Sequence, residues 1–194
     1  MDGLVVLGQI RLAQGDRSGA VAAIEEAATV LPEAGDRRVP IGAGRVELAF
    51  ALGDVDAAAD WIRGRGVSVG DEPIYPRDGE HRLLARVLIA RGDARSAVPM
   101  LDRWRALAAA QGRTGDIIAT QVLASVVHSA GGDEAAAREA LADALILAAR
   151  EGHLRVFLAE GAPLAAVLRG LLVDRRLEQM AGTVARARAL GLLD

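Results

Sequence analysis

The sequence contains no cysteine and no lysine, and aromatic residues make up only 3% of it. Without cysteine there can be no disulfide framework and no thiolate metal site. Without lysine there can be no G-x-x-x-x-G-K-[ST] phosphate loop, because that loop needs its lysine to reach the phosphates. Hydrophobic residues nevertheless make up 52% of the chain, and Ala, Leu and Val supply most of them. Such a mixture favours close packing of helices over a β-sheet core.

An excess of positive charge and a long apolar run are also missing. The formal net charge is −3, which is not the basic footprint of a nucleic-acid-binding domain. No apolar run approaches the roughly 20 residues of a membrane-spanning helix, and the first residues lack the basic region of a signal peptide. We therefore expect a cytoplasmic protein in which this segment contacts neither nucleic acid nor membrane.

The sequence does contain an internal repeat. A Gly-Asp pair recurs four times, beginning at Gly15, Gly53, Gly92 and Gly132, with spacings of 38, 39 and 40 residues. Five residues after each Gly comes an Ala, at Ala20, Ala58, Ala97 and Ala137. Four residues further on comes a large aliphatic residue, at Ile24, Ile62, Leu101 and Leu141. Four pairs in phase with matching downstream residues indicate a repeated structural unit.

Each unit of this repeat is predicted to be an antiparallel helical hairpin. A glycine can adopt the left-handed conformation that ends a helix, and the following Asp can accept backbone N–H bonds at the start of the next helix. The Ala then lies one turn into the second helix, where a larger side chain would separate the paired helices. Because one hairpin cannot cover its own apolar face, hairpins of this kind stack into a solenoid.

The repeat and its helical periodicity fix the expected elements. Helices are predicted at 3–14, 17–31, 39–52, 54–64, 78–91, 93–111, 115–130 and 133–151. A long loop is expected over 65–77. Residues 1–153 then form four hairpins, and residues 154–194 form capping helices of the same solenoid, near 154–159, 163–172 and 177–190.

Several positions of the first unit resemble the tetratricopeptide (TPR) family, whose units are near 34 residues long. Leu7-Gly8 matches that family's Leu-Gly pair, and Ala27 and Pro32 match its late Ala and Pro. Other units depart from the pattern, since Arg65 and Trp104 replace the late Ala. The resemblance implies an all-α, tetratricopeptide-like superhelical solenoid of antiparallel helix pairs with C-terminal capping helices, built from extended repeats.

A narrower resemblance covers most of residues 45–172. The stretches at 71–75 (DEPIY), 81–92 (HRLLARVLIARG) and 151–161 (EGHLRVFLAEG) are similar to the C-terminal repeats of MalT-like, large ATP-binding LuxR-type transcriptional regulators. In that family the repeats act as a sensor or arm between an NTPase module and a helix-turn-helix. The resemblance implies an effector-sensing or protein-interaction segment, with ATP and DNA binding confined to other domains. The alternative is a tetratricopeptide adaptor unrelated to transcription.

The inner wall of such a stack is the candidate binding site. The family's groove positions lie eleven and fifteen residues before the repeated Ala, and their polar members here are Gln9, Glu47, Arg82 and Arg86. The apolar members are Val5, Ala43, Val122 and Val126. Arg82 and Arg86 are four residues apart, on one face of a helix, and could bind a carboxylate, a phosphate or an acidic peptide. The competing interpretation is a solvated face, or pairing with Glu47.

Catalytic and metal sites are not expected. The three histidines, His81, His128 and His153, have no helical ligand spacing among them, so a zinc site is not indicated. Ser125 and its neighbours lack a base and an acid at a recognisable spacing. Trp61 and Trp104 lie on predicted second helices, where packing is the expected role. We therefore expect a non-catalytic protein without a cofactor, with a small inducer, a peptide or a regulatory protein as its ligand.

Overall fold

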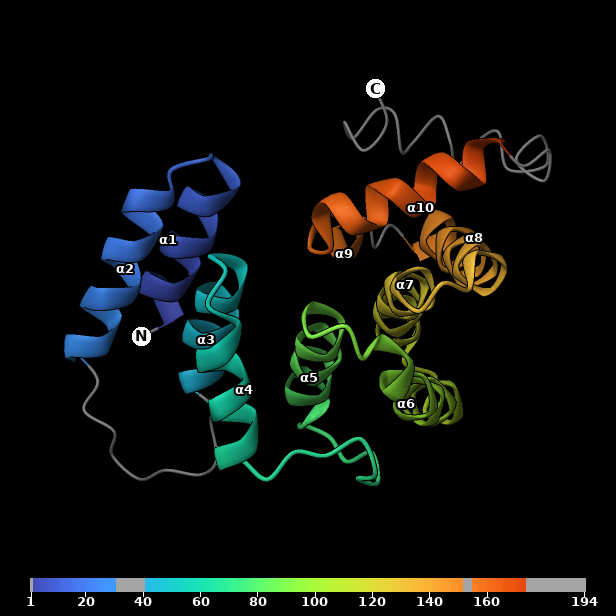
Figure 1. Ribbon diagram of the computed structural model, residues 1–194, viewed down its shortest axis with the longest axis horizontal. Coiled ribbons are helices and arrows are strands. Elements are labelled where there is room, and N and C mark those ends of the chain that lie inside the picture. The colour runs from blue at the N-terminus through green and yellow to red at the C-terminus, as the bar shows by residue number, and fades with distance from the viewer. Residues whose placement is uncertain (1, 31–40, 152–154, 174–194) are drawn as a thin grey trace. The chain divides into compact units, whose positions relative to one another are not determined.

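A computed structural model describes residues 2–30, 41–151 and 155–173, and in these ranges the regular structure is entirely helical (Figure 1). The elements are α1 (Asp2–Ala13), α2 (Arg17–Val30), α3 (Ile41–Ala51), α4 (Val55–Gly64), α5 (Asp78–Ala90), η1 (Ala94–Ala97), α6 (Val98–Ala110), α7 (Thr114–Ala130), α8 (Glu134–Glu151), α9 (Arg155–Leu158) and α10 (Gly161–Val173). The all-helical prediction is confirmed for this part of the chain. The helix expected at 93–111 is divided into η1 and α6, and the ends of the other described helices lie within about two residues of the expected ones. The expected helix at 177–190 lies outside the described residues.

The four Gly-Asp pairs form the turns inside the hairpins. Gly15, Gly53, Gly92 and Gly132 have φ angles of 81°, 103°, 77° and 84°. Each of these glycines lies in the left-handed region that a side chain disfavours. At the first turn the Gly15 N–H donates to the Leu12 carbonyl and the Asp16 N–H donates to the Arg11 carbonyl. The other three turns repeat this pair of bonds, so the glycine ends one helix while its neighbour turns the chain toward the next.

Three of the four Asp residues cap the following helix as predicted. The carboxylate accepts the N–H three residues on at 2.8–3.0 Å, in Asp16 from Gly19, in Asp54 from Ala57 and in Asp133 from Ala136. Asp93 instead accepts the Ser96 hydroxyl at 2.7 Å, and the chain first forms the short 3-10 helix η1. The reason is Pro99, which has no N–H to donate one turn back, so α6 begins next to it at Val98.

The repeated Ala lies between the paired helices in every hairpin. Ala20, Ala58, Ala97 and Ala137 are each 0% exposed, which confirms the predicted role of the small side chain. The aliphatic residues four positions on, Ile62, Leu101 and Leu141, are buried on the same face. A small Cβ at the point of closest approach therefore allows two helix backbones to pack with the larger side chains on either side.

The chain divides into two compact units, residues 1–67 and 68–194. In the first unit α1 packs against α2 and α3, and α3 packs against α4. The contact between α1 and α3 is close at Gly8, because a Cβ built there would lie 2.3 Å from Leu48 Cδ2. Arg17 Nη2, at the start of α2, donates to the Leu52 carbonyl beyond α3 at 2.8 Å, so the first hairpin also stabilises the end of the next helix.

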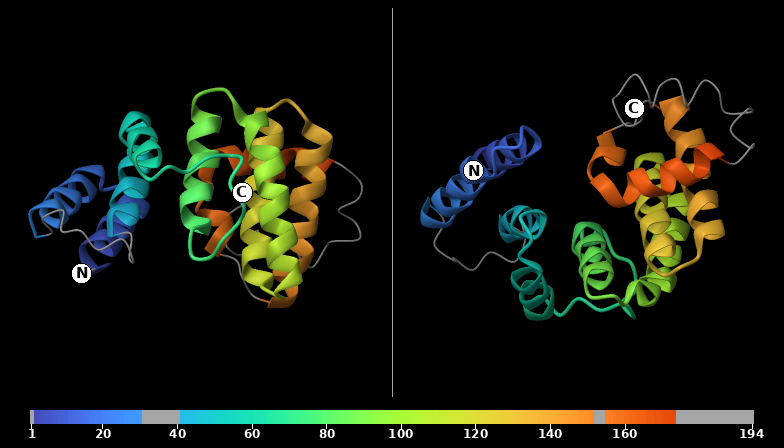
Figure 2. Two further views of the ribbon diagram at one scale, coloured as in Figure 1. Left: turned by 90° about the horizontal axis from the view of Figure 1, so that it is seen from below. Right: turned by 45° about the horizontal axis from the view of Figure 1, so that its top comes forward.

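In the second unit α7 is the central helix, with α6 and α8 on either side of it (Figure 2). One core cluster joins α7 to the third hairpin and includes Ala85, Ala97, Trp104, Leu123 and Val127. A second cluster joins α7 and α8 to Phe157 of α9 and Leu164, Val167, Leu168 and Leu171 of α10. Figure 1 shows α10, in orange-red, crossing α7 and α8 instead of running alongside them. The superhelical arrangement of all four hairpins and the role of α9 and α10 as caps stay predictions.

No helix in the described part of the chain combines the length and the apolarity that crossing a bilayer requires.

The loop between α4 and α5 lies where the sequence predicts it. Arg103 of α6 binds the segment of this loop that belongs to the second unit, because its guanidinium donates hydrogen bonds to the carbonyls of Val69 and Asp71. The pattern of helices and the one long loop therefore match the expectation for described residues.

The buried Ala gives a direct test of the hairpin packing. We expect Ala137→Leu to lower the free energy of unfolding by about 1–3 kcal/mol, because the added atoms must enter a filled contact between α7 and α8. Ala135→Leu, at an exposed position of the same helix, is the matched control and should change stability by less than about 0.5 kcal/mol. Urea unfolding of both variants measures the difference, and equal values would contradict the packing role.

Candidate functional site

The predicted site residues Arg82 and Arg86 belong to a group of charged side chains on one face of α5, which we call the α5 polar cluster. Its members are Asp78, Arg82 and Arg86 of α5, Asp116 of α7 and Glu160, the residue before α10. The three α5 residues are spaced by four, which places them on one helical face. Leu83, Ala85 and Val87 of the same helix are buried, so α5 is fixed with the charged face directed toward α7 and α10.

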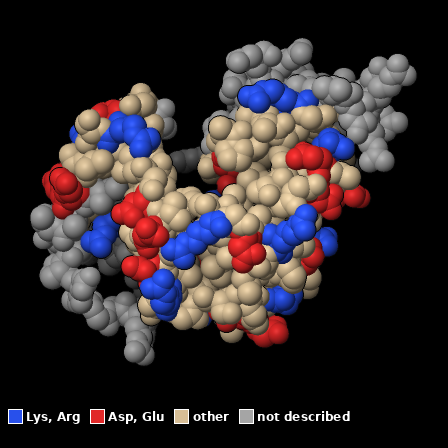
Figure 3. All heavy atoms as spheres, viewed as in Figure 1, with Lys and Arg blue, Asp and Glu red and all other residues tan. Residues whose placement is uncertain are grey.

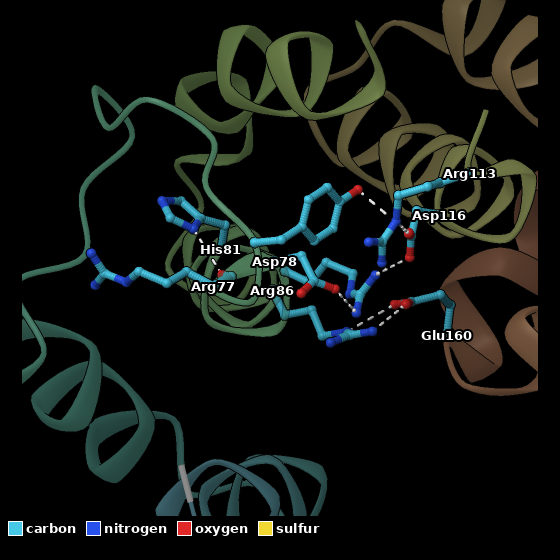
Figure 4. Close-up of polar contacts among 9 residues, drawn as sticks. Arg77, Asp78, His81, Arg86, Arg113, Asp116 and Glu160 are labelled. Atoms are coloured by element: carbon cyan, nitrogen blue, oxygen red, sulfur yellow. Dashed lines mark hydrogen bonds and ion pairs between the residues drawn. The ribbon is translucent and has the colours of Figure 1, made fainter. Parts of the chain in front are cut away.

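The contact between Arg86 and Glu160 joins residues 74 positions apart. Arg86 Nη2 donates to Glu160 Oε1 at 2.6 Å and Nε donates to Oε2 at 3.2 Å. Figure 4 shows the two side chains pointing toward one another from α5 and from the start of α10. The Glu160 side chain is 8% exposed and the Arg86 side chain 22%. A two-pronged pair so little exposed to water is stronger than a surface ion pair, and the loss of one partner leaves the other charge uncompensated.

Arg82 lies between two further carboxylates. Its Nη2 donates to Asp78 Oδ2 at 2.6 Å, one turn earlier on the same helix. Its Nη1 lies 3.9 Å from Asp116 Oδ1 on α7, a Coulomb contact that is too long for a hydrogen bond. Asp116 in turn accepts a bond from Arg113, which precedes α7. These contacts link α5 to the start of α7.

The only tyrosine of the chain borders this cluster. The Tyr75 hydroxyl lies 3.4 Å from Asp116 Oδ2, and the Arg113 guanidinium stacks 3.7 Å from the centre of the Tyr75 ring. Burial, and next the negative charge of Asp116, raise the pKa of Tyr75 above its usual value of 10.0, while Arg113 opposes the rise. The hydrogen bond to Asp116 also raises the pKa of the Arg113 guanidinium. Tyr75 is therefore a reporter of the charges around Asp116.

The other face of the first turn of α5 is buried against α6. His81 Nδ1 lies 3.0 Å from the Arg77 carbonyl, which can only accept, so the proton is assigned to Nδ1. His81 Nε2 lies 3.4 Å from Asp71 Oδ2 but lacks hydrogen-bond geometry. The Trp104 ring centre lies 5.3 Å from that of His81 and 5.2 Å from that of Tyr75. Trp104 is 4% exposed, which confirms its predicted role in packing.

The predicted groove residues fall into different environments. Gln9 is exposed on α1, and Glu47 is half-buried on α3; both belong to the first unit, whereas Arg82 and Arg86 belong to the second. Val122 and Val126, the apolar groove positions of the fourth hairpin, are buried in the cluster that includes α10. The expectation that these two valines line an open wall is therefore wrong, because α10 covers that face of α7. Ligand binding at the four polar positions stays a prediction.

The chemistry available in the cluster is ion pairing. Counting Arg113, three guanidinium groups face three carboxylates, so the group is close to neutral and an added anion must displace a carboxylate. On the face of the molecule in Figure 3, basic and acidic side chains of the described residues are interspersed. Among the described residues no three His, Asp or Glu side chains form a possible metal site. The Ser125 hydroxyl, 0% exposed, donates to the Val122 carbonyl of its own helix at 2.7 Å, as packed helical serines do.

Sequence reasoning found both arginines of the cluster but not Asp78, Asp116 or Glu160. Asp78 could have been found, because it lies four residues before Arg82, at the spacing of a helical ion pair. Asp116 and Glu160 could not, because their positions depend on how α7 and α10 cross α5. Glu160 lies beyond the last hairpin, so the spacing of the repeat does not predict its position.

The profile of the MalT-like TPR region matches residues 1–174, which takes in all four hairpins and α10. Searches of curated proteins and of solved structures found no match.

The pH behaviour of Tyr75 tests the geometry around Asp116. Because the sequence lacks lysine and cysteine, Tyr75 is the only side chain expected to titrate near pH 10. We expect its phenolate absorbance to appear with a midpoint above 10.0. Asp116→Asn should lower that midpoint and Arg113→Gln should raise it, since these side chains act on the phenolate with opposite signs.

Linkage gives the corresponding stability effect. A raised folded-state pKa means that the unfolded chain loses the Tyr75 proton first, so stability that is present below pH 10 is lost as the pH rises through the folded-state value. Urea midpoints of the native chain should therefore fall between pH 9 and pH 11 more than those of Tyr75→Phe. Parallel pH dependence of the two proteins would contradict the assigned environment.

Proposed function

The chain belongs to the family of MalT-like TPR regions, and from this membership we propose that it is an effector-sensing or protein-interaction repeat domain of a bacterial LuxR/MalT-like transcriptional regulator. It acts in the cytoplasm and is non-catalytic by itself. The observation that carries the proposal is the match over residues 1–174, together with the turns and buried alanines that repeat in all four hairpins. A helical repeat scaffold of this kind presents side chains for recognition, and its function lies in those side chains rather than in the fold.

The α5 polar cluster supplies the recognition chemistry. Arg86 offers two donors in a fixed fork, which fits a carboxylate or a phosphate, and in the structure that fork is filled by Glu160. We infer that an anionic effector binds Arg82 and Arg86 by taking the place of Glu160. Since Glu160 directly precedes α10, this exchange releases the ion pair that ties α10 to α5. The effector thereby acts on the C-terminal helices through a local exchange of partners.

The alternative, a tetratricopeptide adaptor, is less well supported by the same observations. An adaptor would use the hairpins to hold other proteins, without a small effector and without a link to transcription. The family match supports the regulator hypothesis instead. Thermal-shift measurements with sugars, nucleotides and dicarboxylic acids separate the two, because only a sensor is stabilised by a small molecule at concentrations above its Kd.

The two arginines are tested by replacing both. We expect Arg82→Ala with Arg86→Ala to weaken binding of the small anion identified in that screen by tenfold or more, as the loss of one or two charge-assisted hydrogen bonds of about 1.5–3 kcal/mol requires. Arg105→Ala, at an exposed position of α6, is the matched control and should leave the affinity unchanged. Calorimetry gives the affinities, and circular dichroism confirms that helicity is kept. Equal affinities of the double variant and the control would count against this site.

The exchange with Glu160 predicts effects of opposite sign on stability and on binding. Glu160→Gln weakens the pair with Arg86, so we expect the free energy of unfolding to fall by about 1–3 kcal/mol. The same change removes the competing carboxylate, so the affinity for the anionic effector should rise. Glu139→Gln, on an exposed position of α8, should alter neither quantity. If Glu160→Gln lowers the affinity, Glu160 is part of the binding site and does not compete with the effector.

A further inference from the structure

Two polar atoms of the α5 polar cluster face each other without a hydrogen bond. Arg82 Nη1 lies 3.9 Å from Asp116 Oδ1, and we call the space between these two atoms the Arg82–Asp116 gap. The neighbouring atoms are engaged, since Arg82 Nη2 donates to Asp78. Asp116 Oδ2 accepts from Tyr75 and Arg113. A donor and an acceptor this far apart are too distant for a direct bond, but a single oxygen between them can bond to both.

The gap lies within reach of a molecule that binds Arg86. The side chains of Arg82 and Asp116 are 27% and 23% exposed, so the gap is open to solvent. Arg86 follows Arg82 by one helical turn on the same face, which places their Cβ atoms roughly 5–6 Å apart. Figure 4 shows Asp116 and Glu160 both directed toward α5. A ligand that replaces Glu160 in the fork of Arg86 therefore has a second contact point one turn away.

The charge balance limits the chemical group that the gap accepts. Arg82 lies between the carboxylates of Asp78 and Asp116, and Arg113 pairs with Asp116. Two positive and two negative charges therefore already balance around the gap. A second anionic group of a ligand would lie beside both carboxylates without a cation of its own. An ammonium group would lie against the guanidinium of Arg82, and neither of these two groups can accept a hydrogen bond.

A hydroxyl group satisfies both atoms of the gap without adding charge. Its oxygen accepts a hydrogen bond from Arg82 Nη1, and its proton is donated to Asp116 Oδ1. A ligand hydroxyl thus reproduces both bonds of a water molecule that it displaces, whereas an apolar carbon chain displaces the water and replaces neither bond. At the other end of the ligand, one carboxylate takes the place of the Glu160 carboxylate, and the net charge of the cluster is unchanged.

We infer that the effector is a hydroxylated monocarboxylate, of which a sugar acid is an example. Its carboxylate occupies the fork of Arg86, and one of its hydroxyls bridges Arg82 Nη1 and Asp116 Oδ1. The inference rests on the proposed function, which places an anionic effector on these arginines without naming its class. The carboxylate supplies attachment and the hydroxyl supplies specificity, because a site that bonds a ligand hydroxyl rejects an analogue without it.

Compounds of equal carbon-chain length test the inference on the native chain. Gluconate has one carboxylate and a hydroxyl on each remaining carbon, so the position of the bridging hydroxyl need not be chosen. Hexanoate lacks the hydroxyls, glucarate has a second carboxylate, and glucose has no carboxylate. We expect gluconate to bind at least about tenfold more tightly than each of the other three in calorimetry. Hexanoate binding as tightly as gluconate would contradict the hydroxyl bridge, and glucarate doing so would contradict the limit to one negative charge.

Replacement of Asp116 tests where the hydroxyl binds. The ratio of the affinities for gluconate and hexanoate is the readout, because the loss of a carboxylate also favours anions in general. We expect Asp116→Ala to bring the two affinities within about threefold of each other, since the hydroxyl loses its acceptor. Asp102→Ala, at an exposed position of α6, is the matched control and should keep the full preference. Circular dichroism verifies that both variants keep their helicity. An unchanged preference in Asp116→Ala would overturn the assigned bridge.

Failure of this inference can be told apart from failure of the proposed function. If gluconate binds no better than the other three compounds, while a different anion loses affinity in Arg82→Ala with Arg86→Ala, the ligand class is wrong and the anion site stands. If no anion loses affinity in that double variant, the proposed function fails and this inference fails with it.

Discussion

The close approach of two helices at a buried alanine is the contact on which every hairpin of this chain depends. In all four hairpins the Ala five residues after the turn glycine has no exposed surface. A methyl group there lets the backbones come together, and the larger aliphatic residue one turn on then fills the space beside it. This explains why a chain with so few aromatic residues has well-packed cores: its helices approach closely enough for Ala, Val and Leu to suffice.

The turns and the contacts between hairpins support the same arrangement. Each left-handed glycine sets the direction in which the second helix starts, and the Asp after it satisfies backbone N–H groups in three of the four cases. Arginines at the start of the second helix of one hairpin then bind the end of the first helix of the next hairpin. Arg17 donates to the Leu52 carbonyl, and Arg95 donates to the Gly131 carbonyl at 2.9 Å. Both carbonyls lie at the C-terminal end of a helix, where the helix dipole favours a cation.

The sequence predicts those features that depend on residues close together in the chain. A turn glycine, its capping Asp and the Ala five residues later interact within two helical turns, so their spacing is enough to predict helices, turns and buried positions. The same argument shows where prediction stops. The cap at Asp93 fails because Pro99 changes the next turn, and Val122 and Val126 are buried because α10 crosses them. The first effect was present in the sequence and could have been recognised, whereas the second depends on the packing of a helix outside the repeat.

The α5 polar cluster shows most clearly which contacts can be predicted from the sequence and which depend on how the helices pack. A spacing of four residues is enough to place Arg82 and Arg86 on one face, and family resemblance is enough to suggest that this face recognises a ligand. Neither indicates that the fork of Arg86 is already filled by a carboxylate 74 residues away. Because of that contact, Arg86 is not part of an open basic face that a ligand could occupy without displacing another group. In the function proposed above, binding is a competition between an effector and the segment that leads into α10, and the free energy of that competition would couple the site to the C-terminal helices.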